Sequence, residues 1–333
     1  MNTRQILVLK GINGCGPSAI RQIVSESNSI SPSLLSDSEL LEFVNSCVAS
    51  GIKRSRLNLL SKSDFSKAVD NADRILDKSV RLGIGAVSYL DPSFPIQLTN
   101  TVNEDGKPNV PLILFYKGNL SVTQRKGIAI IGTREPTKEG ISVSEFLGEK
   151  LAEAGYNIVS GLATGCDTAG HRGALKAIEG RTTAFLAHGL DSIYPPENEP
   201  LAESIIYNGG LLLSEYPVGE SVNNYYLVAR DRLEAALSEA TIVIQTGIHG
   251  GTNHAANTTL VSGKPLFCVK FDSDALMQSE VVKGNTALVL RGAKYITSGD
   301  YISQITSSIG GPLFNKKEEF PEQDPEQELL LFP

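Results

Sequence analysis

The sequence predicts an α/β fold, with a doubly wound and mostly parallel sheet covered by helices on both faces and preceded by a small all-α domain. From Lys126 to Phe271, short apolar segments alternate with amphipathic helical segments, which is typical of a parallel sheet with crossover helices. The expected strands are almost continuously apolar, as strands buried on both faces are. Residues 1–87 instead carry apolar side chains at helical spacing.

The helical domain is expected over residues 1–87. Its segment LLSDSELLEFVNSCVASGI, residues 34–52, has apolar residues at helical spacing after a Ser/Asp-rich start. Upstream, LKGINGCGPSAIRQIV places a glycine turn between two helical segments. This turn resembles a helix-hairpin-helix, whose backbone N–H groups can bind a phosphate, and it equally fits a tight turn that only packs two helices. The sequence leaves both interpretations open.

The α/β domain is expected over residues 88–310, beginning with an irregular, proline-containing connector and one strand in NVPLILFYKGNL. The strands of the alternating region are expected at 127–133, 157–161, 182–187, 241–247 and 265–271. The helices are expected at 138–156, 167–180, 200–210, 230–240 and 252–264, with LLLSEYP following the third. The first of these helices is expected to turn one face to the core, made of Val143, Phe146, Leu147, Leu151 and Ala154.

Composition and charge limit the function classes. Of the 333 residues, 41% are apolar and 20% are charged, as in ordinary globular proteins. The net charge of −7 argues against a broadly basic surface that coats nucleic acid, so any polyanion site is expected to be local. The four cysteines form no CxxC pair, which indicates neither a disulfide framework nor a zinc ribbon. No signal peptide or membrane span is recognisable, so a cytoplasmic protein without membrane attachment is expected.

The segment AIIGTREPTKEG indicates a phosphate site at the end of the strand at 127–133. In open α/β sheets, ligands bind beyond the carboxyl ends of the strands. There, Gly132 lets a phosphate approach the backbone, and Arg134 after Thr133 offers a bidentate guanidinium. A plain strand-to-helix turn with a surface arginine is the alternative. The dinucleotide fingerprint GxGxxG is absent, so no nicotinamide cofactor is expected.

The next strand end, SGLATGCDTAGHRGAL, supplies a second group of candidates. Ser160, Gly161 and Gly165 form the turn, and Arg172 follows in the helix. Asp167 and His171 lie four residues apart, so we expect them to pair as a structural scaffold, with Asp167 capping the helix. The other histidines have no ligand spacing, so no metal site is expected. Arg172, Lys176 and Arg181 are candidates for positive charge beside Arg134, or are solvated helix charges.

Three later segments complete the candidate site. The loop HGLDSIYP is a candidate cover for the pocket. Arg230 and Arg232 flank Asp231 at an expected helix start, where cations oppose the helix dipole, so either a bound anion or a salt bridge is expected there. Last, Gly250, Gly251 and Thr252 form a second glycine turn that leads into a helix N-terminus, another candidate phosphate cradle.

Together these segments resemble the DNA-processing protein A family (DprA, also called Smf). The segments that carry the resemblance are YLDPSFPIQL, PLILFYKGNL, IAIIGTR, SGLATGCDTAGHRGAL, GRTTAFLAHGLDSIYP, GGLLLSEYP, RDR and HGGT. The resemblance implies a Rossmann-like domain after a helix-hairpin-helix or SAM-like domain. It also implies a non-enzymatic protein that binds and protects single-stranded DNA, forms a homodimer and loads the recombinase RecA during natural transformation and recombination.

The family's motifs assign DNA-binding roles by position. The G-S/T-R turn is Gly132, Thr133 and Arg134, and Arg181 is at the position of a basic residue before the third strand. The SGxAxGxD…H motif falls on Ser160, Gly161, Ala163, Gly165, Asp167 and His171.

Departures from the family pattern indicate a divergent member. The usual Arg-Asn-Arg is Arg230-Asp231-Arg232, which adds a negative charge beside the expected anion site, and no winged-helix pattern follows Phe271. A role in repair, in a mobile element or in defence therefore stands beside transformation. A nucleotide-binding sensor or nucleoside-monophosphate phosphoribohydrolase of the related superfamily is the alternative function. It is disfavoured because no glutamate follows Gly-Gly-Thr.

The C-terminal segment, residues 311–333, is expected to be an acidic flexible tail with an apolar end. Its residues 328–332, ELLLF, resemble the peptide that docks on the bacterial sliding clamp. Folding of this segment onto its own domain is the alternative.

Overall fold

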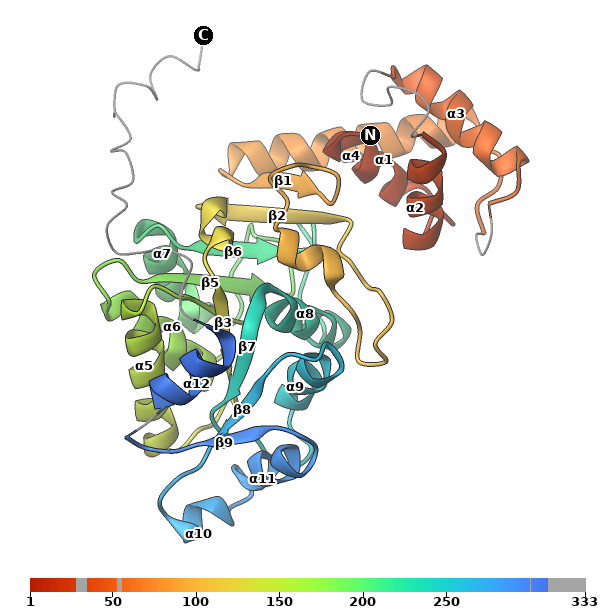
Figure 1. The fold of residues 1–333 in the computed structure, drawn as a ribbon. Coiled ribbons are helices and arrows are strands. Elements are labelled where there is room, and N and C mark those ends of the chain that lie inside the picture. The colour runs from red at the N-terminus through yellow and green to blue at the C-terminus, as the bar shows by residue number, and fades with distance from the viewer. Residues whose placement is uncertain (28–34, 53–55, 300, 311–333) are drawn as a thin grey trace.

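The computed structural model describes the chain except for residues 28–34, 53–55, 300 and 311–333 (Figure 1). The expected acidic tail and its clamp-like segment at 328–332 lie outside the described residues. No helix in the described part is long and apolar enough to span a bilayer.

Four α-helices lie in the described part of the N-terminal region (Figure 1). They are α1 (Thr3–Gly11), α2 (Pro17–Glu26), α3 (Asp37–Ala49) and α4 (Lys62–Arg81). Capping boxes start two of them, with Asn2 and Gln5 at α1 and Ser36 and Glu39 at α3. Between α1 and α2, Gly14 has φ +80°, and a Cβ there would lie 2.6 Å from the Arg56 carbonyl oxygen, so the turn is packed against residue 56.

The α/β region contains a nine-stranded sheet in the order β1-β2-β6-β5-β4-β3-β7-β8-β9. The strands are β1 (Gly85–Ser88), β2 (Ile113–Gly118), β3 (Gly127–Ile131), β4 (Asn157–Ser160), β5 (Arg181–Leu186), β6 (Leu211–Ser214), β7 (Ser238–Val243), β8 (Leu266–Val269) and β9 (Lys294–Ile296). The strands from β3 to β9 run parallel, while β2 pairs antiparallel with both β1 and β6. The prediction of a mostly parallel α/β sheet is confirmed.

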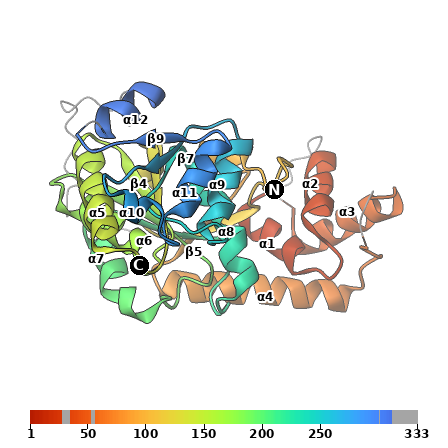
Figure 2. The same ribbon diagram turned by 90° about the horizontal axis from the view of Figure 1, so that it is seen from below.

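Helices cover both faces of the sheet (Figures 1 and 2). They are α5 (Lys138–Glu153), α6 (Cys166–Lys176), α7 (Glu199–Tyr207), α8 (Asn224–Leu237), α9 (Thr252–Val261), α10 (Asp274–Met277), α11 (Lys283–Leu290) and α12 (Tyr301–Ile309). Strand β3 shows the two-sided burial: Ile128 and Ile130 pack into the core under α5 and α12, whereas Ala129 and Ile131 pack under α9 and α11. This alternation explains the continuously apolar strands.

Three local expectations need correction. Strand β1 lies where an irregular connector was expected, and the expected boundary at residue 88 cuts through it. Helix α8 begins at Asn224, capped by the Asn223 side chain, rather than at Arg230. In α5, Phe146 is 46% exposed and packs beside Tyr301, because the buried face of α5 instead uses small residues to contact α6 closely.

The strand order places a topological switch between β3 and β7. From β3 the chain continues through β4, β5 and β6 on one side, then returns through α8 to β7 on the other side of β3. Loops that leave neighbouring strands in opposite directions open a crevice at the carboxyl edge. The fold therefore predicts a ligand site beyond the ends of β3 and β7.

Candidate functional site

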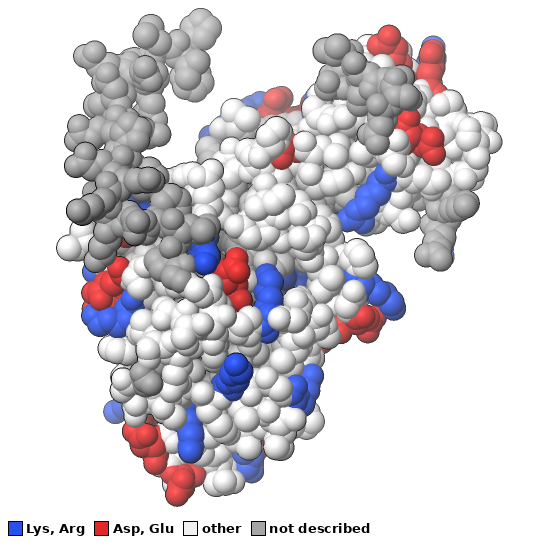
Figure 3. All heavy atoms as spheres, viewed as in Figure 1, with Lys and Arg blue, Asp and Glu red and all other residues white. Residues whose placement is uncertain are grey.

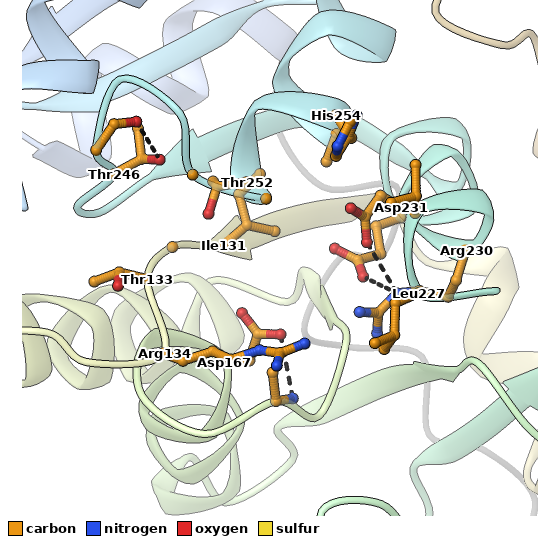
Figure 4. Close-up of a pocket in the computed structure, with 18 of the residues that line it drawn as sticks. Ile131, Thr133, Arg134, Asp167, Leu227, Arg230, Asp231, Thr246, Thr252 and His254 are labelled. Atoms are coloured by element: carbon orange, nitrogen blue, oxygen red, sulfur yellow. Dashed lines mark hydrogen bonds and ion pairs between the residues drawn. The ribbon is translucent and has the colours of Figure 1, made fainter. Parts of the chain in front are cut away.

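A pocket of about 450 Å³ opens at this switch point. It is lined by the loop after β3, the first three turns of α8, and the turn that leads into α9 (Figure 4). Figure 4 shows Arg134 and Asp167 on one side of the pocket, with Arg230 and Asp231 on the α8 side. The structure thus brings together candidate residues that follow β3, β4 and β7.

The Gly132-Thr133-Arg134 turn is held rigidly between two neighbouring elements. Thr133 N donates to the Gln245 carbonyl at 2.8 Å, and Cys166 N donates to the Thr133 carbonyl at 3.2 Å. A Cβ on Gly132 would lie 2.5 Å from Cys166 Sγ. Glycine is therefore required at position 132 by packing against α6, whatever the pocket binds.

Arg134 is the exposed cation on the rim of this pocket. Its side chain makes no hydrogen bond or ion pair to any described residue. An unpaired guanidinium keeps its full set of N–H donors for a ligand, and its planar fork matches a phosphate. Arg134 is thus the lining side chain best suited to bind an anion.

The second glycine turn lies across the pocket from Arg134. Gly250, Gly251 and Thr252 all line it, and α9 begins at Thr252 with no side-chain hydrogen bond at its N-cap, Gly251. In this turn the N–H groups of Gly250, Asn253 and His254 donate to the carbonyls of residues 247, 250 and 251, which leaves those of Gly251 and Thr252 without a backbone acceptor among the described residues. Asn253 Nδ2 binds the carbonyls of residues 247, 248 and 250, which fixes the turn from behind.

Arg230 lies in the floor of the pocket and has a different set of partners. Its side chain is only 7% exposed. Nη1 donates to the carbonyls of Gly161, at 2.6 Å, and Phe185, at 2.7 Å. Nε lies 3.1 Å from Asp231 Oδ1 and 2.9 Å from Glu234 Oε1. Of the two roles expected for this arginine, the structure shows the salt bridge, and the helix-dipole argument for a bound anion was wrong because α8 begins six residues earlier.

Burial shifts the pKa values of the ionisable residues in the pocket floor, which are Asp167, Arg230, Asp231 and Glu234. It raises the pKa of Asp167 to about 6, with the charge of Arg230 opposing the shift. Burial also raises the pKa of Asp231 and of Glu234, again against the nearby Arg230. For Arg230, burial disfavours the charge, but the carboxylates of Glu234, Asp231 and Asp167 outweigh it and raise its pKa.

The pocket as a whole is not strongly positive. Its charged lining residues are two arginines and four acids: Arg134, Arg230, Glu135, Asp167, Asp231 and Glu234. The face of the molecule shown in Figure 3 likewise carries separate basic and acidic side chains rather than one basic patch. An anion is therefore favoured at the rim, beside Arg134 and the α9 N-terminus, and disfavoured at the acidic floor.

The polar groups of the turn after β4 bond to other parts of the protein and are not free to bind a ligand in the pocket. Ser160 is buried, and its Oγ donates to the Ile130 carbonyl at 2.6 Å. The N–H groups of Gly161 and Ala163 both donate to Asp167 Oδ2, at 3.2 and 3.3 Å. These donors are consequently unavailable to a phosphate. Ala163 and Asp167 line the pocket, whereas Ser160 and Gly161 do not.

Gly165 is the N-cap of α6 and has φ +82°, and a Cβ there would clash with the carbonyl oxygens of Thr133 and Arg134. It therefore supports the turn after β3 without lining the pocket itself. A side chain at position 165 is excluded by both conformation and space.

The expected pairing of Asp167 with His171 is wrong. His171 is fully buried, and its Nδ1 lies 2.6 Å from Thr182 Oγ1. Burial, with the nearby positive charge of Arg230, lowers its pKa to about 3, so this histidine is neutral near pH 7. Asp167 binds the preceding turn instead of capping α6 or reaching the histidine.

Three predicted DNA-binding arginines lie outside the pocket. Arg181 begins β5 and pairs in register with Asn157, so it lies at the amino edge of the sheet, opposite the pocket. Arg172 is exposed in the middle of α6. Arg232 is buried, with Nη2 2.7 Å from Glu215 Oε2 and Nη1 bonded to the Ala229 carbonyl. The expectation that Arg181 adds charge beside Arg134 is therefore wrong, because a residue before a strand lies at the opposite edge from a residue after one. The loop HGLDSIYP, likewise, does not line the pocket.

Sequence reasoning missed several residues that shape the site. Besides accepting from Thr133 N through its main-chain carbonyl, Gln245 also fixes the end of the turn after β3 through its side chain. Its Oε1 accepts from Thr137 N at 2.9 Å, and its Nε2 donates to Thr137 Oγ1. Glu234 was not considered, although it lies one helical turn after Arg230. His254, which lines the pocket, is 2.7 Å from Glu104 Oε1. The i,i+4 spacing of Arg230 and Glu234 was the one signal that pointed to this cluster.

Comparison with known proteins assigns the chain to a family. The model of DNA recombination-mediator protein A matches residues 85–307. The chain belongs to this family. The protein Smf of Synechocystis sp. is 35% identical over 234 residues, which are 69% of this chain and 55% of that protein. The DNA processing protein DprA of Bacillus subtilis is 31% identical over 72% of this chain and 77% of its own length.

Solved structures of DprA proteins share the fold. The crystal structure of DprA from Streptococcus pneumoniae superposes with a TM-score of 0.70 at 27% identity, covering 91% of this chain and 98% of that one. DprA from Helicobacter pylori superposes with a TM-score of 0.56 at 26% identity, covering 67% and 94%. The latter structure is described in terms of a single-stranded DNA binding mode. The family resemblance seen in the sequence is confirmed.

Proposed function

We propose that this protein binds single-stranded DNA at the pocket between β3 and β7 and acts in DNA recombination. The observation that carries the proposal is the exposed guanidinium of Arg134, which has no partner among the described residues and lies on the same pocket as the glycine turn before α9. Arg134 offers charge-assisted donors to a phosphate, and the N–H groups of Gly251 and Thr252 add two backbone donors to the lining of the same pocket. Family membership and the single-stranded DNA binding described for the H. pylori relative support the choice of ligand.

The acidic floor restricts how a strand lies. A phosphate that entered deeply would approach Asp231, Glu234 and Asp167, whereas one at the rim meets Arg134. The backbone of the strand is accordingly proposed to cross the rim. Gly132, Thr133, Ala163, Gly250, Gly251 and Thr252 are proposed to form the contact surface around it. Ser160, Gly161, Gly165, Asp167, His171, Arg230 and Arg232 are proposed to support that surface.

Arg172 and Arg181, which the sequence also suggests as DNA-binding residues, are not part of the proposed contact surface. Each lies away from the pocket, so neither is proposed to share a phosphate with Arg134. A homodimer and the transfer of the bound strand to the recombinase RecA in the cytoplasm complete the proposal, as the family resemblance implies. The proposed activity is binding without catalysis.

The test compares binding of a fluorescent single-stranded oligonucleotide to the wild type, Arg134→Ala and Arg172→Ala. Hydrogen bonds to charged groups contribute about 1.5–3 kcal/mol, so Arg134→Ala is expected to lose roughly tenfold or more in affinity. Arg172 is the matched control, an exposed arginine on α6 outside the pocket, and its loss is expected to cost less. Equal affinity of Arg134→Ala and the wild type would reject the pocket as the DNA site.

One observation favours a second candidate, a nucleotide sensor or phosphoribohydrolase. The sequence offered no acid after Gly-Gly-Thr, yet the fold brings Asp167, Asp231 and Glu234 into the same pocket. A carboxylate beside a bound ribose can stabilise an oxocarbenium-like centre. Incubation with each nucleoside monophosphate, followed by chromatography, tests this candidate. Release of free base by the wild type but not by Glu234→Gln would establish it, and no release would remove the hydrolase.

A further inference from the structure

Three tyrosines form a cluster beside the pocket that no part of the proposed phosphate site uses. Tyr216 follows β6, and Tyr225 and Tyr226 lie in the first turn of α8. The rings of Tyr216 and Tyr226 are stacked, with centroids 3.8 Å apart and an interplanar angle of 24°. Tyr225 is tilted against Tyr226, with centroids 6.1 Å apart at 58°. The cluster is thus a fixed aromatic pair with a third ring added on its outer side.

Tyr225 is the accessible member of this cluster, with 77% of its surface exposed. Tyr216 and Tyr226 are half-buried. An aromatic ring has only two side-chain torsions to fix, so a ring supported on one side loses little conformational entropy when a planar ligand covers the other. The supported but uncovered ring of Tyr225 is suited to stacking.

The cluster adjoins the proposed phosphate site. Asn224 and Val228 both line the pocket, and Tyr225 lies next to Asn224 in sequence and one turn before Val228 on the same helix. On the other side of the cluster, Lys10 Nζ of α1 donates to the Glu215 carbonyl at 3.2 Å. The cluster therefore has the pocket on the side of Asn224 and Val228, and the end of α1, where Lys10 is near Glu215 and Glu220, on the side of Tyr216.

We propose that Tyr225, supported by Tyr226 and Tyr216, is a stacking platform for an unpaired nucleobase of the strand whose phosphate lies at Arg134. The inference rests on the proposed function and adds a recognition element to it. The free guanidinium of Arg134 on the pocket rim suits a ligand that joins flat bases through anionic phosphates. Binding sites for single strands combine cationic contacts to the phosphates with aromatic side chains on which bases stack.

The experiment compares two oligonucleotides of equal length, one of thymidines and one in which abasic sites replace the bases. Tyr225→Leu is expected to lower affinity for the thymidine strand by roughly five- to twentyfold, and Tyr225→Phe to retain it because the ring remains. On the abasic strand, the wild type and Tyr225→Leu are expected to bind equally. The slope of affinity against salt is expected to be the same for both, since no phosphate contact is removed.

A matched control is Tyr207→Leu, which removes a 90% exposed tyrosine at the end of α7. It is expected to bind as the wild type does. The chain has no tryptophan, so quenching of tyrosine fluorescence by the bound strand, reduced in Tyr225→Leu, gives an independent readout. Thermal unfolding of each variant checks that it is folded.

The outcomes separate the two proposals. Full affinity of a folded Tyr225→Leu for the thymidine strand, with wild-type binding intact, overturns the stacking platform alone and points to a protein partner for this surface. Failure of the wild type to bind either strand overturns the DNA-binding function and the platform with it. Loss of affinity in Arg134→Ala on both strands, but in Tyr225→Leu only on the strand with bases, supports both.

Discussion

Arg134 and Arg230 line the same pocket, but the structure uses them in opposite ways. Arg134 is exposed on the rim and has no partner among the described residues, whereas Arg230 is buried and joins two carbonyls and two carboxylates. A buried charge whose donors are already bonded is not available to a ligand, and its removal leaves its partners unpaired, whereas a free charge on a rim is available to a ligand. Proximity to a pocket therefore does not by itself make an arginine a binding residue.

The largest expected difference between the two arginines is in the free energy of unfolding. Arg230→Met leaves Asp231 and Glu234 buried without their cation, and removing one partner of such a cluster typically costs about 3–5 kcal/mol. Arg134→Met is expected to change the free energy of unfolding by less than about 0.5 kcal/mol. Urea unfolding of the two variants measures both. Similar stabilities for the pair would contradict the assignment of Arg230 to the scaffold.

Two glycines, Gly161 beside Arg230 and Gly251 in the turn before α9, are expected to differ in how well they tolerate a side chain. A Cβ on Gly161 would collide with the Arg230 guanidinium, while a Cβ on Gly251 would meet nothing within 4 Å. Gly161→Ala is expected to destabilise the protein by about 3 kcal/mol, near the upper end for overpacking. Gly251→Ala is expected to cost a few tenths of a kcal/mol. Thermal or urea unfolding measures both changes in stability. An unchanged stability of Gly161→Ala would show that the Arg230 guanidinium can move away from Gly161.

These contrasts also show what the sequence can predict. Alternating strands and helices predicted the sheet because each apolar strand is buried on both faces, and the glycine turns predicted the edge where the pocket opens. β1 was missed because a short strand at the sheet edge, GAVS, lacks a long apolar run. Asp167 and His171 were paired because spacing along a helix does not reveal where buried side chains point. The carbonyl partners of Arg230 are Gly161, just after β4, and Phe185 in β5, and only the fold brings these two residues to α8.

The pH dependence of stability is expected to reflect the acidic floor. The pKa of Asp167, about 6 in the folded protein, lies above its unfolded value near 3.9. The stability due to the protonated group is therefore complete below about pH 4 and is lost as the pH rises through about 6. Relative to Asp167→Asn, the wild type is expected to lose on the order of 2 kcal/mol between pH 4 and 7.

The measurement is urea unfolding of both proteins at half-unit pH steps. Taking the difference between the two proteins removes the opposite contribution of His171, whose pKa is lowered to about 3 in the folded state. A difference that stays constant from pH 4 to 7 would mean that Asp167 titrates normally.

A smaller effect is expected on DNA affinity. Asp231→Asn removes one negative charge from the pocket and can still accept from Arg230 Nε through its amide oxygen. Affinity for a single-stranded oligonucleotide is expected to rise roughly two- to fivefold, as for one unit charge across a solvated pocket. Glu153→Gln, which alters an exposed acid at the end of α5, is the control. A fall in affinity would instead indicate that Asp231 contacts the ligand.

The salt dependence of oligonucleotide binding tests the central claim most directly, because it counts phosphate contacts. For single strands, each phosphate neutralised by a cation contributes about 0.7 to the slope of log affinity against log salt concentration. The wild type and Arg134→Ala, measured between 50 and 300 mM salt, are expected to differ in slope by about 0.7. Identical slopes would contradict the conclusion that Arg134 holds a phosphate on the rim of this pocket.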